Sequence, residues 1–189
     1  MGARGRKSQY VKVVTNKDAE MLSGLARVGY MDRSMLVNAM GLSENRLKNY
    51  ERDGYLERCA HMDKKTGDER AVWTLTQRGR TLCESQLGID SYYKSSSAGH
   101  DLTLAQKYMD LEPEDRERWV TESEWREMYY DKFGVDLPES LSPPDGGYIT
   151  STGELIAYEV VTPSYRGVDI AAKMEYCESM GASYVQERW

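Results

Sequence analysis

Residues 34–54, SMLVNAMGLSENRLKNYERDG, decide how the first half of the chain folds. Ser34 is suited to cap a short helix, and Gly41 stands where a helix-ending glycine belongs. Ser43 is placed to cap a second helix of about ten residues, which ends near Gly54. Two short helices joined by a tight turn predict a helix-turn-helix unit.

The second helix of this unit has two chemically different faces. Leu47 and Tyr50 are three residues apart and face the core. The opposite face carries side chains of the types that reach base edges and phosphates in a major groove. They are Asn45, Lys48, Asn49 and Arg52, with Arg46 beside them. A plain solvated face would more often include Glu, and Glu51 lies to the side, so the pattern favours DNA recognition.

Segments on either side of this unit complete a small domain. Residues 17–28 repeat apolar side chains at helical steps, and residues 55–59 and 70–75 alternate like the strands of a hairpin. The hairpin is basic, and we expect these cations to contact DNA: Lys64, Lys65 and Arg70. Residues 1–16 are predicted to be a basic flexible arm, which either contacts phosphates or is a disordered tail.

A helix-turn-helix followed by a basic hairpin resembles the winged-helix family over residues 17–88. The strand that ends at Leu75 and the helix that Thr76 would cap also resemble that family's usual ending. The resemblance implies that the helix carrying Asn45 and Arg52 enters the major groove of double-stranded DNA. It also implies that the hairpin touches the DNA backbone or the minor groove.

The net charge divides the chain into two halves. The 189 residues carry a formal charge of −6, which alone would argue against a nucleic-acid partner. Residues 1–88, however, hold 16 Lys and Arg against 11 Asp and Glu, a net charge of +5, whereas residues 89–189 have a net charge of −11. We therefore predict a DNA-binding domain at 17–88, a linker at 89–99 and an acidic α/β domain at 100–189.

The cysteines and the hydropathy pattern predict a cytoplasmic protein without a membrane partner. Cys59, Cys83 and Cys177 follow no metal-binding spacing and are predicted to be reduced packing residues. No apolar run approaches the roughly 20 residues that are needed to cross a bilayer. The basic N-terminus has no apolar segment behind it, so no signal peptide is predicted.

The acidic half contains a second hairpin with a carboxylate on each strand. Residues 143–149 and 154–161 read as its strands, and a helix is predicted at 168–180. Carboxylates on adjacent strands, here Asp145 and Glu159, can hold a divalent cation such as Mg²⁺. A nearby lysine would then help to activate a water molecule for phosphodiester hydrolysis.

This hairpin resembles the PD-(D/E)xK nuclease fold, also found in restriction endonucleases, with Pro144-Asp145 at the first motif and Glu159-Val160-Val161 at the second. Val161 stands where that family has its lysine, so Lys173 on the following helix would replace it, with Glu122 as an additional acidic residue. The resemblance implies Asp145, Glu159 and Lys173 as catalytic residues, and Asp145 and Glu159 as Mg²⁺ ligands if the domain is active. The missing lysine favours a non-catalytic domain that requires no cofactor.

The whole arrangement over residues 17–189 resembles the replication-relaxation proteins of plasmids, phages and conjugative elements. The features that carry it are the winged helix, the sequence Gly99-His100-Asp101-Leu102 opening a helix, Pro144-Asp145-Gly146 and Tyr158-Glu159-Val160. The resemblance implies a sequence-specific protein that binds the double-stranded DNA of a mobile element and acts in transcriptional control or in replication and mobilisation. We expect an α+β protein whose acidic domain forms a homodimer or binds another protein.

Two other functions stay open on the sequence. One is a metal-dependent DNA nuclease or nickase that uses Asp145, Glu159 and Lys173. The other is a mobile-element inhibitor of a host defence enzyme. In that case the acidic half would enter the enzyme's nucleic-acid channel, and the helix-turn-helix would regulate the inhibitor's own gene.

Overall fold

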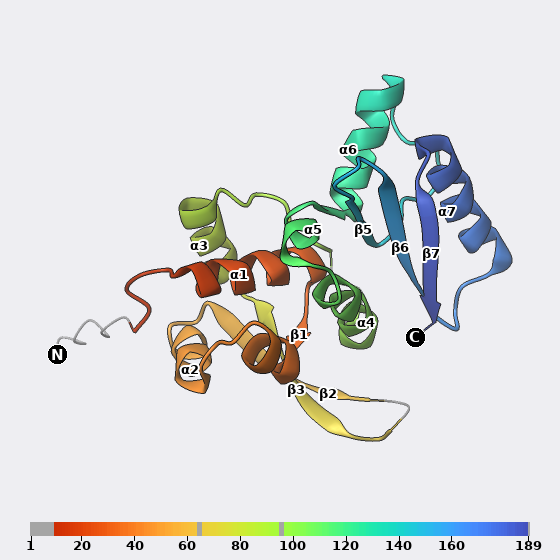
Figure 1. Ribbon diagram of the computed structural model, residues 1–189. Helices are drawn as coiled ribbons and strands as arrows, with labels where there is room; N and C mark the ends of the chain where they lie inside the picture. The colour runs from red at the N-terminus through yellow and green to blue at the C-terminus, as the bar shows by residue number, and fades with distance from the viewer. Residues whose placement is uncertain (1–9, 64–65, 95–96, 189) are drawn as a thin grey trace, which may run out of the picture.

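The computed structural model describes residues 10–63, 66–94 and 97–188. In this part of the chain, helices and strands are mixed and the strands form two separate sheets (Figure 1). The predicted α+β class is confirmed at that level. Lys64, Lys65 and residues 1–9 of the predicted arm lie outside the described residues.

The first half of the chain folds into helices around a small sheet. In chain order its elements are α1 (Asn16–Val28), β1 (Met31–Asp32), η1 (Ser34–Ala39), α2 (Glu44–Arg52), β2 (Leu56–Met62), β3 (Glu69–Leu75) and α3 (Gln77–Leu87). The described strands are antiparallel and lie in the order β1-β3-β2. Figure 1 shows the β2–β3 hairpin extending away from the helices.

Side-chain caps fix where these helices begin. Ser43 and Thr76 each accept a hydrogen bond from the backbone N–H three residues on, as the sequence predicts. Ser34 does not cap the turn that follows it. Instead, the η1 turn includes Ser34, and the carboxylate of Asp32 accepts the N–H of Met35 at 3.0 Å. The two short helical segments that the sequence predicts here are therefore present as η1 and α2, with a different cap on the first.

The second half contains a mixed sheet. Its elements are α4 (Ala98–Met109), α5 (Pro113–Glu117), β4 (Trp119–Thr121), α6 (Glu122–Phe133), β5 (Gly146–Ile149), β6 (Leu155–Val161), α7 (Gly167–Met180) and β7 (Ser183–Arg188). Among the described residues, the strand order is β4-β5-β6-β7. β4, β5 and β6 are antiparallel neighbours, whereas β7 is parallel to β6 because α7 returns the chain to the same end of the sheet.

Helices cover both faces of this second sheet. Trp125 of α6 and Tyr176 of α7 pack with Val120 of β4 on one face. Trp119 of β4 and Val160 of β6 belong instead to a core that includes α1 and α4. Neighbouring residues of a strand point to opposite faces, so β4 contributes one residue to each core.

Part of the predicted linker at 89–99 is packed against the first half, because Ile89, Tyr92 and Tyr93 contact its core, whereas residues 95 and 96 lie outside the described residues. Tyr93 is buried, and its N–H donates to the carbonyl of Ala26 at 2.7 Å. α4 then begins at Ala98, ahead of residue 100, where the second domain is predicted to start. Charge pattern and small polar residues suggested a flexible connection, but the apolar ring of Tyr93 anchors it.

Contacts between α1 and the second half make the two halves share one core. The ring of Tyr108 lies so close to Gly24 of α1 that a Cβ added there would lie 3.3 Å from it. The guanidinium of Arg27 donates to the carbonyl of Trp119 at the start of β4. The boundary that the charge pattern predicts therefore does not separate two hydrophobic cores.

The remaining sequence expectations concern membranes and thiols. In the part of the chain that the structure describes, no helix has the length and apolar composition to cross a bilayer. Cys59, Cys83 and Cys177 are free thiols, in agreement with their prediction as packing residues.

Candidate functional site

α2 carries a polar face that points away from the core, and we call Asn45, Lys48, Asn49 and Arg52 the α2 face. Leu47 and Tyr50 on the other side of the helix are completely buried. Asn45, Lys48 and Arg52 are exposed, and Asn49 is half-buried. The structure thus brings these predicted DNA-contacting residues together on one accessible surface.

Arg46 does not belong to this accessible surface. Its Nε and Nη2 atoms donate to the two carboxylate oxygens of Asp18 at 2.9 and 2.5 Å, and Nη2 also donates to the carbonyl of Val13. Asp18 lies in α1 and its side chain is only 1% exposed. Arg46, expected among the DNA-contacting residues, instead holds α2 against α1.

The described segment before α1 begins at Tyr10, beside the C-terminal end of the α2 face. Asp53 accepts the backbone N–H groups of Tyr10 and Val11 at 2.8 and 2.6 Å. The Arg52 guanidinium lies over the Tyr10 ring, 4.7 Å from its centroid. The described end of the predicted arm is therefore fixed next to a basic residue of α2.

The hairpin cations Arg70 and Arg58 differ in their contacts and exposure. Arg70 on β3 is ion-paired with Asp63 at 2.6 Å and with Asp32 at 3.5 Å. Arg58 on β2 is exposed and lies 5.9 Å from the ring centroid of Trp73, and the sequence analysis did not select it. Strand alternation places Arg58 on the face of Leu56 and opposite Trp73, both buried, so nothing in the strand pattern indicated that Arg58 is exposed.

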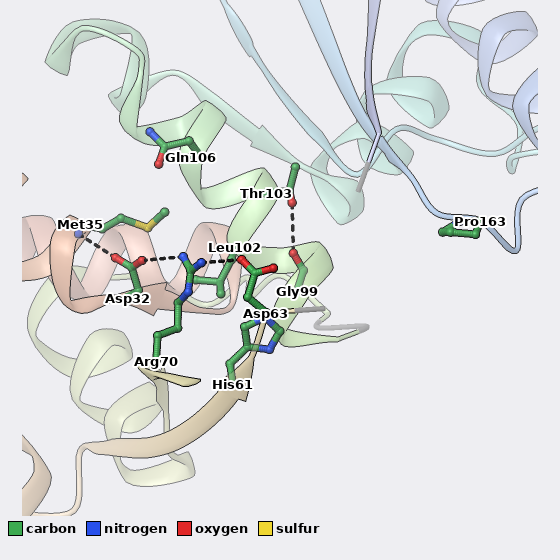
Figure 2. Close-up of a pocket in the computed structure, with 10 residues that line it drawn as sticks. All are labelled: Asp32, Met35, His61, Asp63, Arg70, Gly99, Leu102, Thr103, Gln106 and Pro163. Carbon is green, nitrogen blue, oxygen red and sulfur yellow. Dashed lines mark hydrogen bonds and ion pairs between the residues drawn. The ribbon is translucent and has the colours of Figure 1, made fainter. Parts of the chain in front are cut away.

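A cavity of about 430 Å³ lies between this hairpin and α4 (Figure 2). Arg70 sits between Asp32 and Asp63 on its hairpin side, and Leu102 and Thr103 of α4 line the facing side. The guanidinium of Arg70 is thus already neutralised by the carboxylates of Asp32 and Asp63. We therefore do not place Arg70 in the same class as the exposed cations of the α2 face.

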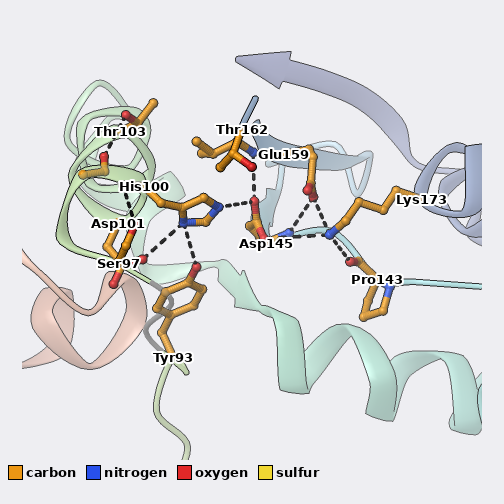
Figure 3. A network of polar contacts seen from close by, with 12 residues as sticks. Tyr93, Ser97, His100, Asp101, Thr103, Pro143, Asp145, Glu159, Thr162 and Lys173 are labelled. Atoms are coloured by element: carbon orange, nitrogen blue, oxygen red, sulfur yellow. Dashed lines mark hydrogen bonds and ion pairs between the residues drawn. The ribbon is translucent and has the colours of Figure 1, made fainter. Parts of the chain in front are cut away.

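In the second half, the structure brings together the three residues that the sequence selected for catalysis. The ammonium of Lys173 on α7 lies 2.8 Å from Oε2 of Glu159 in β6 and 3.8 Å from Oδ1 of Asp145 before β5 (Figure 3). The backbone N–H of Asp145 also donates to Glu159. Lys173 thus does approach the carboxylate pair from another element.

The sequence motif that contains His100 and Asp101 indicates no role for either residue. His100 is buried and its Nε2 lies 3.0 Å from Oδ2 of Asp145. Its Nδ1 lies 3.2 Å from Asp101 and 3.3 Å from the hydroxyl of Tyr93. A histidine next to an aspartate at a helix start was the available signal, but its partner is 45 residues away.

Burial and pairing shift the acid–base properties of this cluster. Burial and the neighbouring Asp145 carboxylate together raise the pKa of Glu159 to about 7, although Lys173 partly opposes them. For Asp145 burial opposes ionisation, but the hydrogen bond from His100 and the charge of Lys173 lower its pKa overall. For His100 burial favours the neutral form, but Asp101 and Asp145 outweigh it and raise its pKa to about 9.

The raised pKa of His100 predicts a specific loss of stability in alkaline solution. A group whose pKa is higher in the folded state stabilises that state fully below its ordinary value of 6.5, and this contribution is lost as pH rises through about 9. We expect the free energy of unfolding to fall by about 3 kcal/mol between pH 6 and 9 from this group. Urea unfolding should show this decrease, and His100→Gln should lack it. An equal decrease in both proteins would contradict the assignment.

The cluster lies at a cleft of about 1010 Å³, which Asp145, Lys173 and His100 line. Glu122 also lines this cleft, but its carboxylate is paired with Arg126 at 2.9 Å. Among the described residues, no three His, Cys, Asp or Glu side chains are placed to hold a metal ion together. The ammonium of Lys173 stands between the two carboxylates, where a divalent cation would bind. The side chains as arranged therefore do not fit a Mg²⁺ site.

Comparisons of this chain with models of protein families, with curated proteins and with solved structures give no match.

Proposed function

We propose that this protein binds double-stranded DNA of a specific sequence through the α2 face. The observation that carries the proposal is that Asn45, Lys48, Asn49 and Arg52 are presented together on a helix whose other side is fixed in the core. A short helix with donors on one accessible side suits a major groove, and Asn and Arg can make paired hydrogen bonds to adenine and guanine. In this proposal Lys48 serves a phosphate and Arg58 adds a contact from the hairpin.

The order of elements supports a winged-helix interpretation of the first half. α1, β1, η1 and α2 are followed by the hairpin β2–β3, and β1 adds a strand beside β3. In this interpretation α2 is the recognition helix and the hairpin is the wing. Lys64 and Lys65 keep their proposed role at the tip of the wing, which lies outside the described residues.

The acidic second half has a different role in this proposal. Its net charge of −11 repels the DNA backbone, and Lys173 neutralises the carboxylates that a nuclease would use for a cation. We interpret this half as a nuclease-like α/β domain that acts without catalysis and assembles with a second copy or another protein. The replication-relaxation resemblance favours a mobile element's transcriptional control or replication, in the cytoplasm.

Selection from random duplexes tests the proposal with the full chain. We expect enrichment of one sequence motif, and a homodimer would select an inverted repeat with half-sites about 10 base pairs apart. Failure to enrich any motif at low salt would contradict sequence-specific binding. Enrichment of a single unrepeated site would retain DNA binding and contradict the dimer.

Salt dependence gives a quantitative prediction for Lys48. An ammonium that contacts a phosphate releases about one counterion, so Lys48→Ala should reduce the slope of log affinity against log salt by about 0.9. The effect should be nearly the same for specific and random duplexes. Titrations at several salt concentrations measure it, with Lys107→Ala as the control because Lys107 is paired with Glu187 on the acidic half. An unchanged slope for Lys48→Ala would contradict a phosphate contact.

A further inference from the structure

A cluster of buried charges joins the second sheet to the helices on both of its sides (Figure 3). Asp145 precedes β5, Glu159 lies in β6, Lys173 comes from α7 and His100 from α4. Each of these residues is no more than 8% exposed. Buried charges destabilise a fold unless they are paired, so the pairing within the cluster determines whether this arrangement can exist.

Lys173 occupies the centre of the acidic side of the cluster. Its ammonium contacts Oε2 of Glu159 and faces Oδ1 of Asp145, and it also donates to the carbonyl of Pro143 at 3.0 Å. The third contact fixes the backbone that leads into Asp145. The ammonium thus supplies one positive charge and several donors to the oxygens that a divalent cation would otherwise use.

His100 connects the other side of the cluster to α1. The carboxylate of Asp145 is held by His100 at 3.0 Å and by the backbone N–H of Val160 at 2.8 Å. Next to His100, Asp101 lies against Gly29 at the C-terminal end of α1. A Cβ added to Gly29 would lie 2.9 Å from Oδ2 of Asp101. Close contacts therefore run from the second sheet to the end of α1.

We propose that this cluster is a metal-independent fastening between the halves, in which Lys173 takes the place of a divalent cation and His100 ties the sheet to α4 and α1. It has a chemical consequence. Removing the ammonium leaves the buried Asp145 and Glu159 carboxylates facing a vacated position, which a hard divalent cation such as Mn²⁺ can occupy. The fastening is independent of DNA binding, and either proposal can fail without the other.

Thermal unfolding of the full chain with EDTA or with millimolar Mn²⁺ tests this inference. For the unaltered protein, we expect the same Tm in both solutions. For Lys173→Ala, we expect a lower Tm in EDTA and a rise of at least ~3 °C on adding Mn²⁺. Lys132→Ala is the matched control, because Lys132 also donates to carbonyls, those of Ser179 and Met180, but faces no buried carboxylate pair. Its Tm should not respond to Mn²⁺.

Three results would overturn the fastening. The first is an Mn²⁺ response of the unaltered protein as large as that of Lys173→Ala, which would make a metal the resident group. The second is a folded Lys173→Ala without any Mn²⁺ response. The third is an equal response in Lys173→Ala/Glu159→Gln, which retains one carboxylate of the pair. If Lys173→Ala aggregates, expression with added Mn²⁺ should restore soluble protein, and failure to do so would also overturn the proposal.

Discussion

Replacing Arg46 by Met is expected to lower the free energy of unfolding by about 3 kcal/mol, although Arg46 lies on the helix assigned to DNA recognition. The substitution leaves the carboxylate of Asp18 buried in α1 without its guanidinium partner. Met keeps most of the apolar stem, so the loss reports mainly the unpaired charge. Urea unfolding followed by far-UV circular dichroism at pH 7 measures it.

Arg33→Met is the matched control for this substitution. Arg33, between β1 and η1, is ion-paired with Glu44 at the start of α2, but the two side chains are 57% and 44% exposed. Exposed pairs contribute about 0–1 kcal/mol, so this variant should remain close to the unaltered protein. Equal losses in the Arg33 and Arg46 variants would show that burial of Asp18 does not determine the effect.

Acid pH should reduce the difference between the Arg46→Met variant and the unaltered protein. Burial alone would raise the pKa of Asp18, but hydrogen bonds from Arg46 and Thr15 outweigh it and lower the pKa below 3.8. A lowered pKa stabilises the fold above the unfolded-state value, and this contribution is lost as pH falls through the folded-state value. The advantage of the unaltered protein is therefore greatest at neutral pH.

The sequence predicts local features of this fold well because their causes are local. Ser43 and Thr76 cap α2 and α3 through N–H groups three residues away, which any reading of the chain can recognise. Leu47 and Tyr50 face the core because a helix places residues three apart on one side. Each of these predictions needs only the geometry of a single element.

Arg46 and Tyr93 show where such local reasoning stops. Arg46 lies four residues before the buried Tyr50, at the margin of the polar face, but only the packing of α2 on α1 brings it to Asp18. Tyr93 lies in a stretch of small polar residues typical of a linker, yet its N–H reaches Ala26 and its ring is buried. The charge pattern divides the chain by net charge, but it gives no information on the hydrophobic core that the two halves share.

The candidate site of the second half is intermediate between these cases. Lys173 was selected because a family resemblance left a vacant lysine position, and the structure brings it to Glu159 and Asp145. His100 was not selected, since its contact with Asp145 depends on α4 packing across the sheet. The sequence predicted that Asp145, Glu159 and Lys173 meet, but only their positions in the structure show that the ammonium neutralises the carboxylates.

Arg52→Ala is expected to weaken specific DNA binding by roughly 10- to 100-fold, the largest functional effect among the α2 variants. Arg52 is exposed, so the substitution removes a cation from the α2 face without opening the core. Its guanidinium lies over the ring of Tyr10, and losing this contact should affect stability only slightly. Titration of a selected duplex at one fixed salt concentration measures the affinity, and thermal unfolding verifies the fold.

Two further variants decide what Arg52 does in the complex. Arg126→Ala removes an exposed arginine from α6 in the acidic half and should leave DNA affinity unchanged. Arg52→Lys keeps the charge but loses the planar pair of donors, so a contact with guanine would stay weakened whereas a phosphate contact would largely recover. Equal affinities of Arg52→Ala and the unaltered protein would remove Arg52 from the interface. Equal losses of affinity in the Arg52→Ala and Arg126→Ala variants would instead trace the effect to net charge. A contact within the groove predicts a loss for Arg52→Ala alone.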